Sequence, residues 1–92
     1  MKILVLGDVM GLSGRIALKK HLSKIIEEYK IDFTIINGEN AADDGKGITK
    51  EIAEDLFSLG IDVITSGNHI WDKDETTKYI ENESRLLRPA NL

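Results

Sequence analysis

Three short and nearly unbroken runs of apolar residues constrain the fold of this chain more than any other feature. The runs are Ile3–Leu6, Phe33–Ile36 and Ile61–Thr65, and each is rich in β-branched residues. Strands that are buried on both faces of a parallel sheet have this continuous pattern, whereas strands with one solvated face alternate. The runs therefore predict three parallel strands.

Amphipathic patterns fill the intervals between these runs and predict helices. In the first interval, apolar residues recur with helical spacing at Leu18, Leu22, Ile25, Ile26 and Tyr29. In the second interval, one stripe contains Ile48, Ile52, Ala53, Leu56, Phe57 and Leu59. Gly60 follows that stripe, at the position where a left-handed helix cap is expected. A third helix is expected to begin at Asp72, because Asp72 and Glu75 have the spacing of a capping box.

The predicted order β-α-β-α-β-α places the chain in the α/β class, with parallel strands and right-handed crossovers. Residues 1–92 contain no internal repeat or linker, and the segment 85–92 resembles the approach to a fourth strand. A parallel sheet of three strands leaves an open edge and one poorly covered face. We therefore expect residues 1–92 to be the N-terminal part of one domain.

Composition and charge narrow the functional class. The formal net charge of −4 argues against a large nucleic-acid surface, and the lack of cysteine excludes disulfides and thiolate metal sites. The first apolar run stops at Gly7, so it is too short for a signal peptide or a membrane span. These features predict a cytoplasmic protein with no membrane partner.

Each predicted strand is followed by a glycine and then by polar side chains that can bind a metal ion. These side chains are Asp8, then Glu39 and Asn40, and finally Asn68 and His69. Because the carboxyl ends of parallel strands meet at one edge of a sheet, where α/β proteins place their ligands, we expect these residues to converge. Two carboxylates in a small space require a cation, and this donor set suits manganese, iron, magnesium or zinc.

Each of these residues also has a purely structural alternative. Asp8 could cap a turn, the two asparagines could adopt left-handed or capping conformations, and His69 could be a turn residue. Glu39 is the hardest to explain in this way, because glutamate is not a turn former. We favour the metal site because one explanation then accounts for all five residues at three successive strand ends, whereas the alternatives need a separate explanation for each residue.

The segment Gly11-Leu12-Ser13-Gly14-Arg15 is predicted to be a loop that leads into the first helix. Its backbone N–H groups and Arg15 could contact an anion, so Gly11 and Arg15 are candidate substrate-binding residues. However, the segment lacks the Lys-Ser/Thr pair of a P-loop, and its glycine spacing is not the dinucleotide fingerprint.

The chain resembles the YmdB-type branch of the calcineurin-like metallophosphoesterases along its whole length, in the strings Gly7-Asp8, Gly38-Glu39-Asn40-Ala41-Ala42, Gly67-Asn68-His69-x-Trp71-Asp72 and Arg85-Leu86-Leu87-Arg88-Pro89-Ala90-Asn91. Gly-Asn-His alone marks the wider superfamily, whereas the second and fourth strings are specific to the branch. The resemblance implies a four-layer α/β/β/α sandwich that hydrolyses phosphodiesters, typically 2′,3′-cyclic nucleotides.

The resemblance also implies a role for each candidate residue. Asp8 and Asn40 would ligate the first of two divalent metal ions, and Glu39 would bridge both. Asn68 would ligate the second ion, and His69 would donate a proton to the leaving oxygen. The nucleophile would be a metal-bound hydroxide.

One departure from the family pattern separates the functional hypotheses. The family also uses three histidines from a later segment, and this chain has none after His69. We therefore expect half of a phosphodiesterase site, with weak metal binding and negligible turnover by this chain alone. A non-catalytic half-domain that self-associates as a homo-oligomer is the main alternative. A phosphate- or nucleotide-binding module that uses residues 11–15 is a third possibility.

Overall fold

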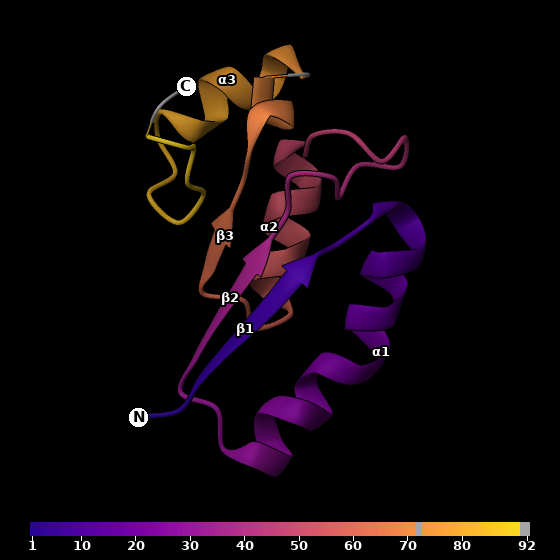
Figure 1. Ribbon diagram of the computed structural model, residues 1–92, viewed down its shortest axis with the longest axis vertical. Helices are drawn as coiled ribbons and strands as arrows, with labels where there is room; N and C mark the ends of the chain where they lie inside the picture. Colours follow the sequence, from indigo (N-terminus) through magenta and orange to yellow (C-terminus); the bar gives the residue numbers. More distant parts are fainter. Residues whose placement is uncertain (72, 91–92) are drawn as a thin grey trace.

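One three-stranded parallel sheet with interleaved helices forms the fold. A computed structural model describes residues 1–71 and 73–90. The elements are β1 (Ile3–Asp8), α1 (Gly11–Tyr29), β2 (Phe33–Asn37), α2 (Lys50–Ser58), β3 (Val63–Thr65), the 3-10 helix η1 (Asn68–Trp71) and α3 (Asp74–Ile80). The strands follow the order β1-β2-β3 (Figure 1), so the predicted α/β class and parallel pairing are confirmed.

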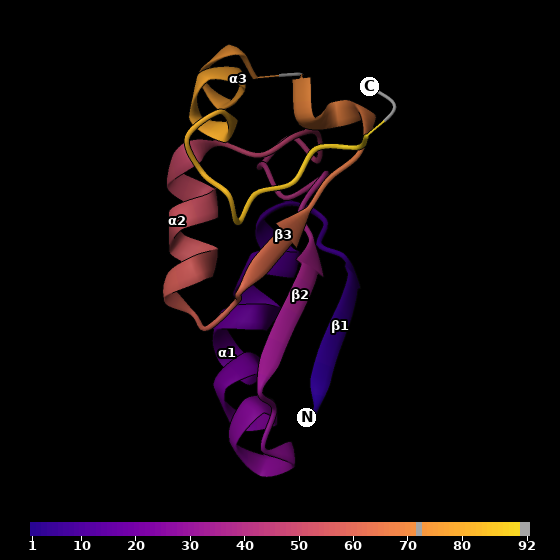
Figure 2. The same ribbon diagram turned by 90° about the vertical axis from the view of Figure 1, so that its left-hand side faces the viewer.

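Helices α1 and α2 cover the same face of the sheet (Figure 2). This arrangement is expected when two crossovers of the same hand connect strands that advance in one direction. On the covered face, Thr34, Ile36 and Ile64 are buried and contribute to the core. Leu22 of α1 and Leu56 of α2 are buried against this layer.

The opposite face of the sheet has no covering layer within the described residues. Ile3 and Val5 of β1 are 54% and 68% exposed, although both are large apolar residues. They lie in register with Phe33 and Ile35 of β2, and Ile35 lies in register with Val63 of β3. The structure therefore confirms the expected poorly covered face, which consists of these five residues and is called the bare face below.

The helices differ from the sequence-based expectations in several places. Gly11 to Arg15 form the first turns of α1, so the predicted loop is wrong. The helix can begin there because Gly11 has a φ of 54°, which glycine adopts without a Cβ clash. Tyr29 belongs to the predicted apolar stripe but is 57% exposed, because α1 ends at this residue and its C-terminal end extends beyond the sheet (Figures 1 and 2). The predicted helix start at Asp72 falls outside the described residues, and the described helix begins at Asp74.

The C-terminal segment approaches β3 as a fourth parallel partner. Leu86 makes an isolated parallel bridge with Ile64, and the Leu87 amide donates to the Ile64 carbonyl at 2.8 Å. This bridge confirms the expected approach to a fourth strand. None of the described helices is both long and apolar enough to cross a membrane.

Candidate functional site

The turns that follow the three strands meet at the carboxyl edge of the sheet, as the sequence predicts. The side-chain amide of Asn40 donates to Oδ2 of Asp8 at 2.9 Å, which joins the turn after β1 to the turn after β2. The carboxylate of Glu39 lies against the α-carbon of Gly67, which joins the turn after β2 to the turn after β3. The structure therefore brings Asp8 to Asn40, and Glu39 to Gly67, which directly precedes Asn68 and His69.

A bulge in β1 determines the position of Asp8. The register shifts between Leu6 and Asp8, so that Asp8, and not Gly7, lies opposite Asn37 of β2. A bulge of this kind redirects the side chain that follows it and increases the local twist. Asp8 is exposed, whereas the next residue, Val9, is buried in the core.

The position of Glu39 depends on Asn37 and Gly67, whose contacts with Glu39 the sequence analysis does not predict. Its backbone N–H donates to Oδ1 of Asn37 at 3.0 Å, in the manner of an Asx turn. A Cβ atom built on Gly67 would overlap the Glu39 carboxylate, so glycine at position 67 provides the space that this carboxylate occupies. Asn37 could have been recognised in the sequence, because an asparagine before a glycine at the end of a strand can form an Asx turn. For Gly67, no local signal indicates the long-range contact.

Asn68 and His69 lie in η1, directly after β3 and Ser66-Gly67. The Ile70 amide donates to the Gly67 carbonyl at 3.1 Å, and the Ile70 side chain is buried, so the turn is anchored in the core. Asn68 is exposed and His69 is half-buried at the same edge of the sheet as Asp8. Their predicted roles as metal ligand and proton donor stay predictions.

The donor chemistry of the site fits a hard divalent cation only in part. Two carboxylates and two amides can offer oxygen atoms to such an ion. However, no group of three His, Cys, Asp or Glu residues within 1–71 and 73–90 comes close enough to hold a metal ion. The site would therefore rely on asparagine oxygens or on further ligands for a full coordination shell.

The loop between β2 and α2 carries Glu39 and Asn40 and is closed by its own backbone. The Gly47 amide donates to the Glu39 carbonyl at 2.6 Å, and the Ala42 amide donates to the Gly47 carbonyl at 2.9 Å. Gly47 has a φ of 75°, a left-handed conformation that favours glycine. The loop is thus a compact turn with a defined shape.

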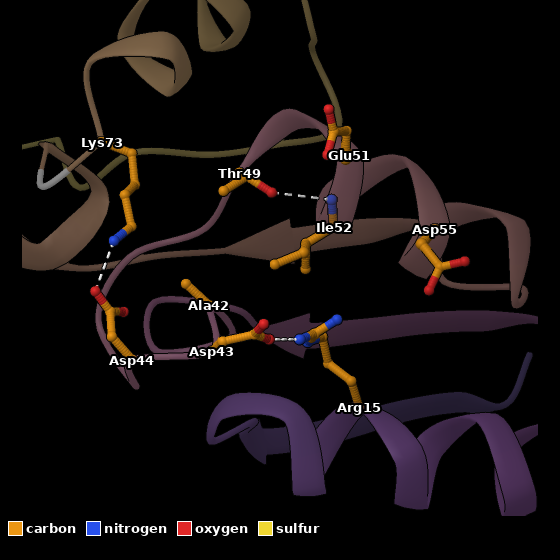
Figure 3. Close-up of a pocket in the computed structure, with 9 residues that line it drawn as sticks. All are labelled: Arg15, Ala42, Asp43, Asp44, Thr49, Glu51, Ile52, Asp55 and Lys73. Carbon is orange, nitrogen blue, oxygen red and sulfur yellow. Dashed lines mark hydrogen bonds and ion pairs between the residues drawn. The ribbon is translucent and has the colours of Figure 1, made fainter.

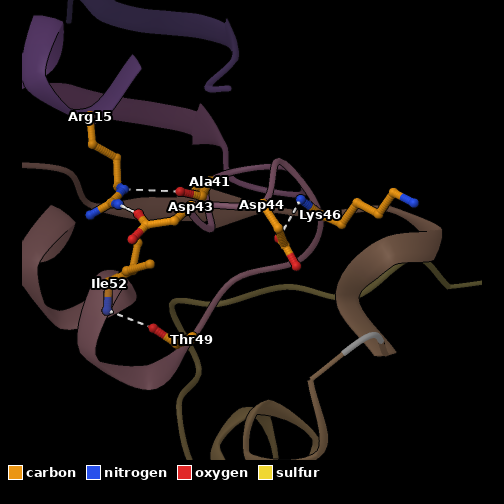
Figure 4. A network of polar contacts seen from close by, with 7 residues as sticks. All are labelled: Arg15, Ala41, Asp43, Asp44, Lys46, Thr49 and Ile52. Atoms are coloured by element: carbon orange, nitrogen blue, oxygen red, sulfur yellow. Dashed lines mark hydrogen bonds and ion pairs between the residues drawn. The ribbon is translucent and has the colours of Figure 1, made fainter. Parts of the chain in front are cut away.

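Gly11 and Arg15, the candidate substrate-binding residues, both contact this loop. The Gly11 amide donates to the Asn40 carbonyl at 2.8 Å, and Nε of Arg15 donates to the Ala41 carbonyl at 2.9 Å. Arg15 also forms an ion pair with Asp43 through Nη2 (Figure 4). Substrate contact by Gly11 and Arg15 stays a prediction, whereas the contacts with the loop are present in the structure.

An open cleft of about 710 Å³ lies beside the same loop (Figure 3). It is lined by four carboxylates and two cationic side chains, namely Asp43, Asp44, Glu51, Asp55, Arg15 and Lys73. The Lys73 ammonium, 2.7 Å from Asp44, and the Lys46 amide lower the pKa of Asp44. None of the predicted metal ligands lines this cleft, so it is distinct from the site at the strand ends.

Comparison with known proteins decides the family. A family model described as YmdB-like protein matches residues 4–92. The chain belongs to the YmdB-like protein family. It is 50% identical over 92 residues to a 2′,3′-cyclic-nucleotide 2′-phosphodiesterase of Bacillus subtilis (strain 168). The matched region covers 100% of this chain and 34% of that protein. The chain therefore spans about a third of the length of this YmdB-like relative.

Two crystal structures confirm the fold. A novel phosphatase from Mycoplasma pneumoniae matches with a TM-score of 0.90 and 36% identity, over 97% of this chain and 31% of that one. A hypothetical protein from Thermus thermophilus matches with a TM-score of 0.86 and 40% identity, over 97% of this chain and 34% of that one. The resemblance to the YmdB-like family that the sequence motifs indicated is thus confirmed.

Proposed function

We propose that the strand-end residues of this YmdB-like chain form part of the active site of a metal-dependent phosphodiesterase. The observation that carries the proposal is the contact between successive turns, from Asp8 to Asn40 and from Glu39 to Gly67. The name of the Bacillus subtilis relative supports 2′,3′-cyclic nucleotides as the substrate class. No large surface for nucleic acid is part of this proposal.

In this proposal, each candidate residue has one role. Asp8 and Asn40 would hold a first divalent ion, Asn68 would hold a second, and Glu39 would contribute its carboxylate to both. A bound pair of manganese, iron, zinc or magnesium ions would neutralise charge on the phosphoryl oxygens and make water more acidic. His69 holds the proton that the leaving oxygen takes up.

The donor count limits what this chain does on its own. Two carboxylates and two amides provide fewer strong ligands than a tight divalent site in a protein normally has. We therefore expect weak binding of manganese and negligible hydrolysis of 2′,3′-cyclic AMP by the 92-residue chain.

The proposal is tested by titrating manganese into the isotopically labelled chain. Paramagnetic broadening of NMR signals reports which residues lie near the bound ion. We expect Asp8, Asn40 and Asn68 to broaden first, and Glu39→Gln to weaken binding by roughly tenfold or more, because it removes a carboxylate from the donor set. Glu28→Gln is the matched control, because Glu28 is an exposed carboxylate in the C-terminal part of α1.

Two results would contradict the proposal. Broadening centred on Asp43, Asp44 and Glu51 would place the cation in the acidic cleft, away from the strand ends. Unchanged affinity in Glu39→Gln would remove Glu39 from the ligand set. In a parallel assay, turnover of 2′,3′-cyclic AMP by the unaltered chain with manganese would show that no further segment is required.

A second candidate function is self-association of a non-catalytic half-domain. The bare face favours it, because Ile3 and Val5 remain more than half exposed on a sheet that also has an open edge at β1. Sedimentation equilibrium distinguishes a monomer from a homo-oligomer. A monomer at all accessible concentrations would argue against this candidate.

A further inference from the structure

Two residues on one face of α1 hold successive carbonyl groups of the loop between β2 and α2. Gly11 and Arg15 are four residues apart, so they lie one above the other on the helix surface. The Gly11 amide holds the Asn40 carbonyl at 2.8 Å, and Nε of Arg15 holds the Ala41 carbonyl at 2.9 Å. The beginning of α1 therefore fixes the backbone directly at Asn40.

The guanidinium of Arg15 makes two different contacts with the loop. Besides its bond to the Ala41 carbonyl, it forms the ion pair with Asp43, which Figure 4 shows from close by. The Arg15 side chain is only 16% exposed, whereas that of Asp43 is 75% exposed. The buried part of this interaction is thus the bond to the backbone carbonyl, and the ion pair lies at the solvent boundary, where such pairs contribute little.

The other side of the loop is held from the α3 region. Nζ of Lys73 lies 2.7 Å from Oδ2 of Asp44, and the Thr76 hydroxyl donates to the Ile48 carbonyl. Thr76 is fully buried, whereas Lys73 and Asp44 are partly exposed. The loop is therefore attached to two separate helices, and Arg15 supplies the helix side-chain contact that lies next to Asn40, beside the backbone bond from Gly11.

We propose that Arg15 is a positioning residue that fixes Asn40 and Glu39 at the strand ends by holding the Ala41 carbonyl. The inference rests on the proposed function. If Arg15 did not hold the loop, Asn40 would be displaced and would lose its 2.9 Å hydrogen bond to Asp8, another proposed metal ligand. It differs from a substrate contact, since Nε and Nη2 of Arg15 already have partners within the chain. Arg15 acts through Asn40 and Glu39 and is not itself a catalytic residue.

Amide hydrogen exchange of the 92-residue chain tests the inference independently of any metal. Arg15→Met removes both contacts, whereas Arg15→Lys keeps a positive charge near Asp43 but has no Nε donor. We expect exchange of the Gly11 and Gly47 amides to accelerate roughly tenfold in Arg15→Met and less in Arg15→Lys, since one hydrogen bond to the backbone is lost. Asp43→Asn, which leaves the Ala41 contact in place, should have the smallest effect.

The same variants are then titrated with manganese. Loss of a residue that orients metal ligands lowers metal affinity by roughly tenfold or more, which is the decrease expected for Arg15→Met. Lys19→Met is the matched control, because it removes an exposed positive charge one turn further along α1. Protection of the Ile36 and Ile64 amides, which lie in the core strands, verifies that each variant is folded.

The outcomes separate this inference from the proposed function. Unchanged exchange at Gly11 and Gly47 in a folded Arg15→Met chain would overturn the inference. Weaker binding of inorganic phosphate with unchanged loop exchange would also overturn it and make Arg15 a substrate contact. If the unaltered chain shows no manganese binding, the proposed metal site fails, while faster loop exchange in Arg15→Met still supports the positioning role of Arg15.

Discussion

The two faces of the central sheet are built from similar residues and have opposite environments. On the face covered by α1 and α2, Ile36 and Ile64 are completely buried. On the bare face, Ile3 and Val5 are largely exposed, and Ile35 is half-buried. The difference shows that hydrophobicity gives each strand two apolar faces, whereas the connections between strands decide which face receives a helix.

The largest expected effect comes from two neighbouring isoleucines on opposite faces of β2. Ile36→Ala should lower the free energy of unfolding by about 3 kcal/mol, because it leaves a cavity under the helices. Ile35→Ala should cost about 1 kcal/mol, because this side chain is only half-buried. Urea unfolding measures both. Equal destabilisation by the two substitutions would mean that the bare face is covered in solution.

Gly38 provides a second way to test the covered face. A Cβ atom at this position would lie 2.7 Å from Cγ2 of Ile64 and 3.2 Å from Cδ1 of Ile48. Gly38→Ala should therefore cost about 2 kcal/mol through overpacking. Gly7→Ala is the matched control, because nothing lies within 4 Å of a Cβ atom there. A Gly38→Ala chain as stable as Gly7→Ala would show that the covered face is loosely packed.

The C-terminal segment is attached to the covered side through a polar contact whose strength depends on pH. Arg85 forms an ion pair with Glu83 at 2.8 Å and lies over the Phe57 ring of α2, 4.0 Å from its centroid. Its hydrogen bonds lower the pKa of Glu83 to about 2. A lowered pKa in the folded state stabilises the fold above the unfolded pKa of about 4.3, and this contribution disappears as the pH falls towards 2.

Glu83→Gln should therefore cost about 1 kcal/mol at neutral pH, a modest value because Arg85 is half exposed. The loss should shrink steadily as the pH falls towards 2, where about half of the Glu83 carboxylates are protonated. Thermal unfolding between pH 2 and pH 7 measures this dependence, with the exposed Glu81→Gln as control. A constant difference across this range would exclude the ion pair as the cause.

The smallest effect on stability is expected on the bare face. Val5→Lys should change the free energy of unfolding by less than about 0.5 kcal/mol, because this side chain is already largely in water. If the chain self-associates through this face, the same substitution should shift the sedimentation equilibrium towards the monomer. A large loss of stability at low protein concentration would show that Val5 is buried within a single chain.

Much of the candidate site could be predicted because it depends on topology. Once three parallel strands are recognised, the turns after them must lie at one edge, which brings the turn that carries Asp8 near the turn that carries Asn40. The bulge before Asp8 and the Asx turn before Glu39 were missed, because they depend on register and local hydrogen bonds. The sequence predicts a loop at residues 11–15, which contain two glycines, whereas these residues form the first turns of α1.

From the sequence alone follow the alternation of strands and helices, the family, and the proximity of the turns that carry Asp8 and Asn40. These features follow from periodicity and from residue types that stand next to each other in the chain. The three-dimensional structure was needed to show which side chains lie on the bare face and that Arg15 holds the loop that carries Asn40. Both depend on contacts between residues far apart in sequence, and these contacts are set by crossover geometry and packing.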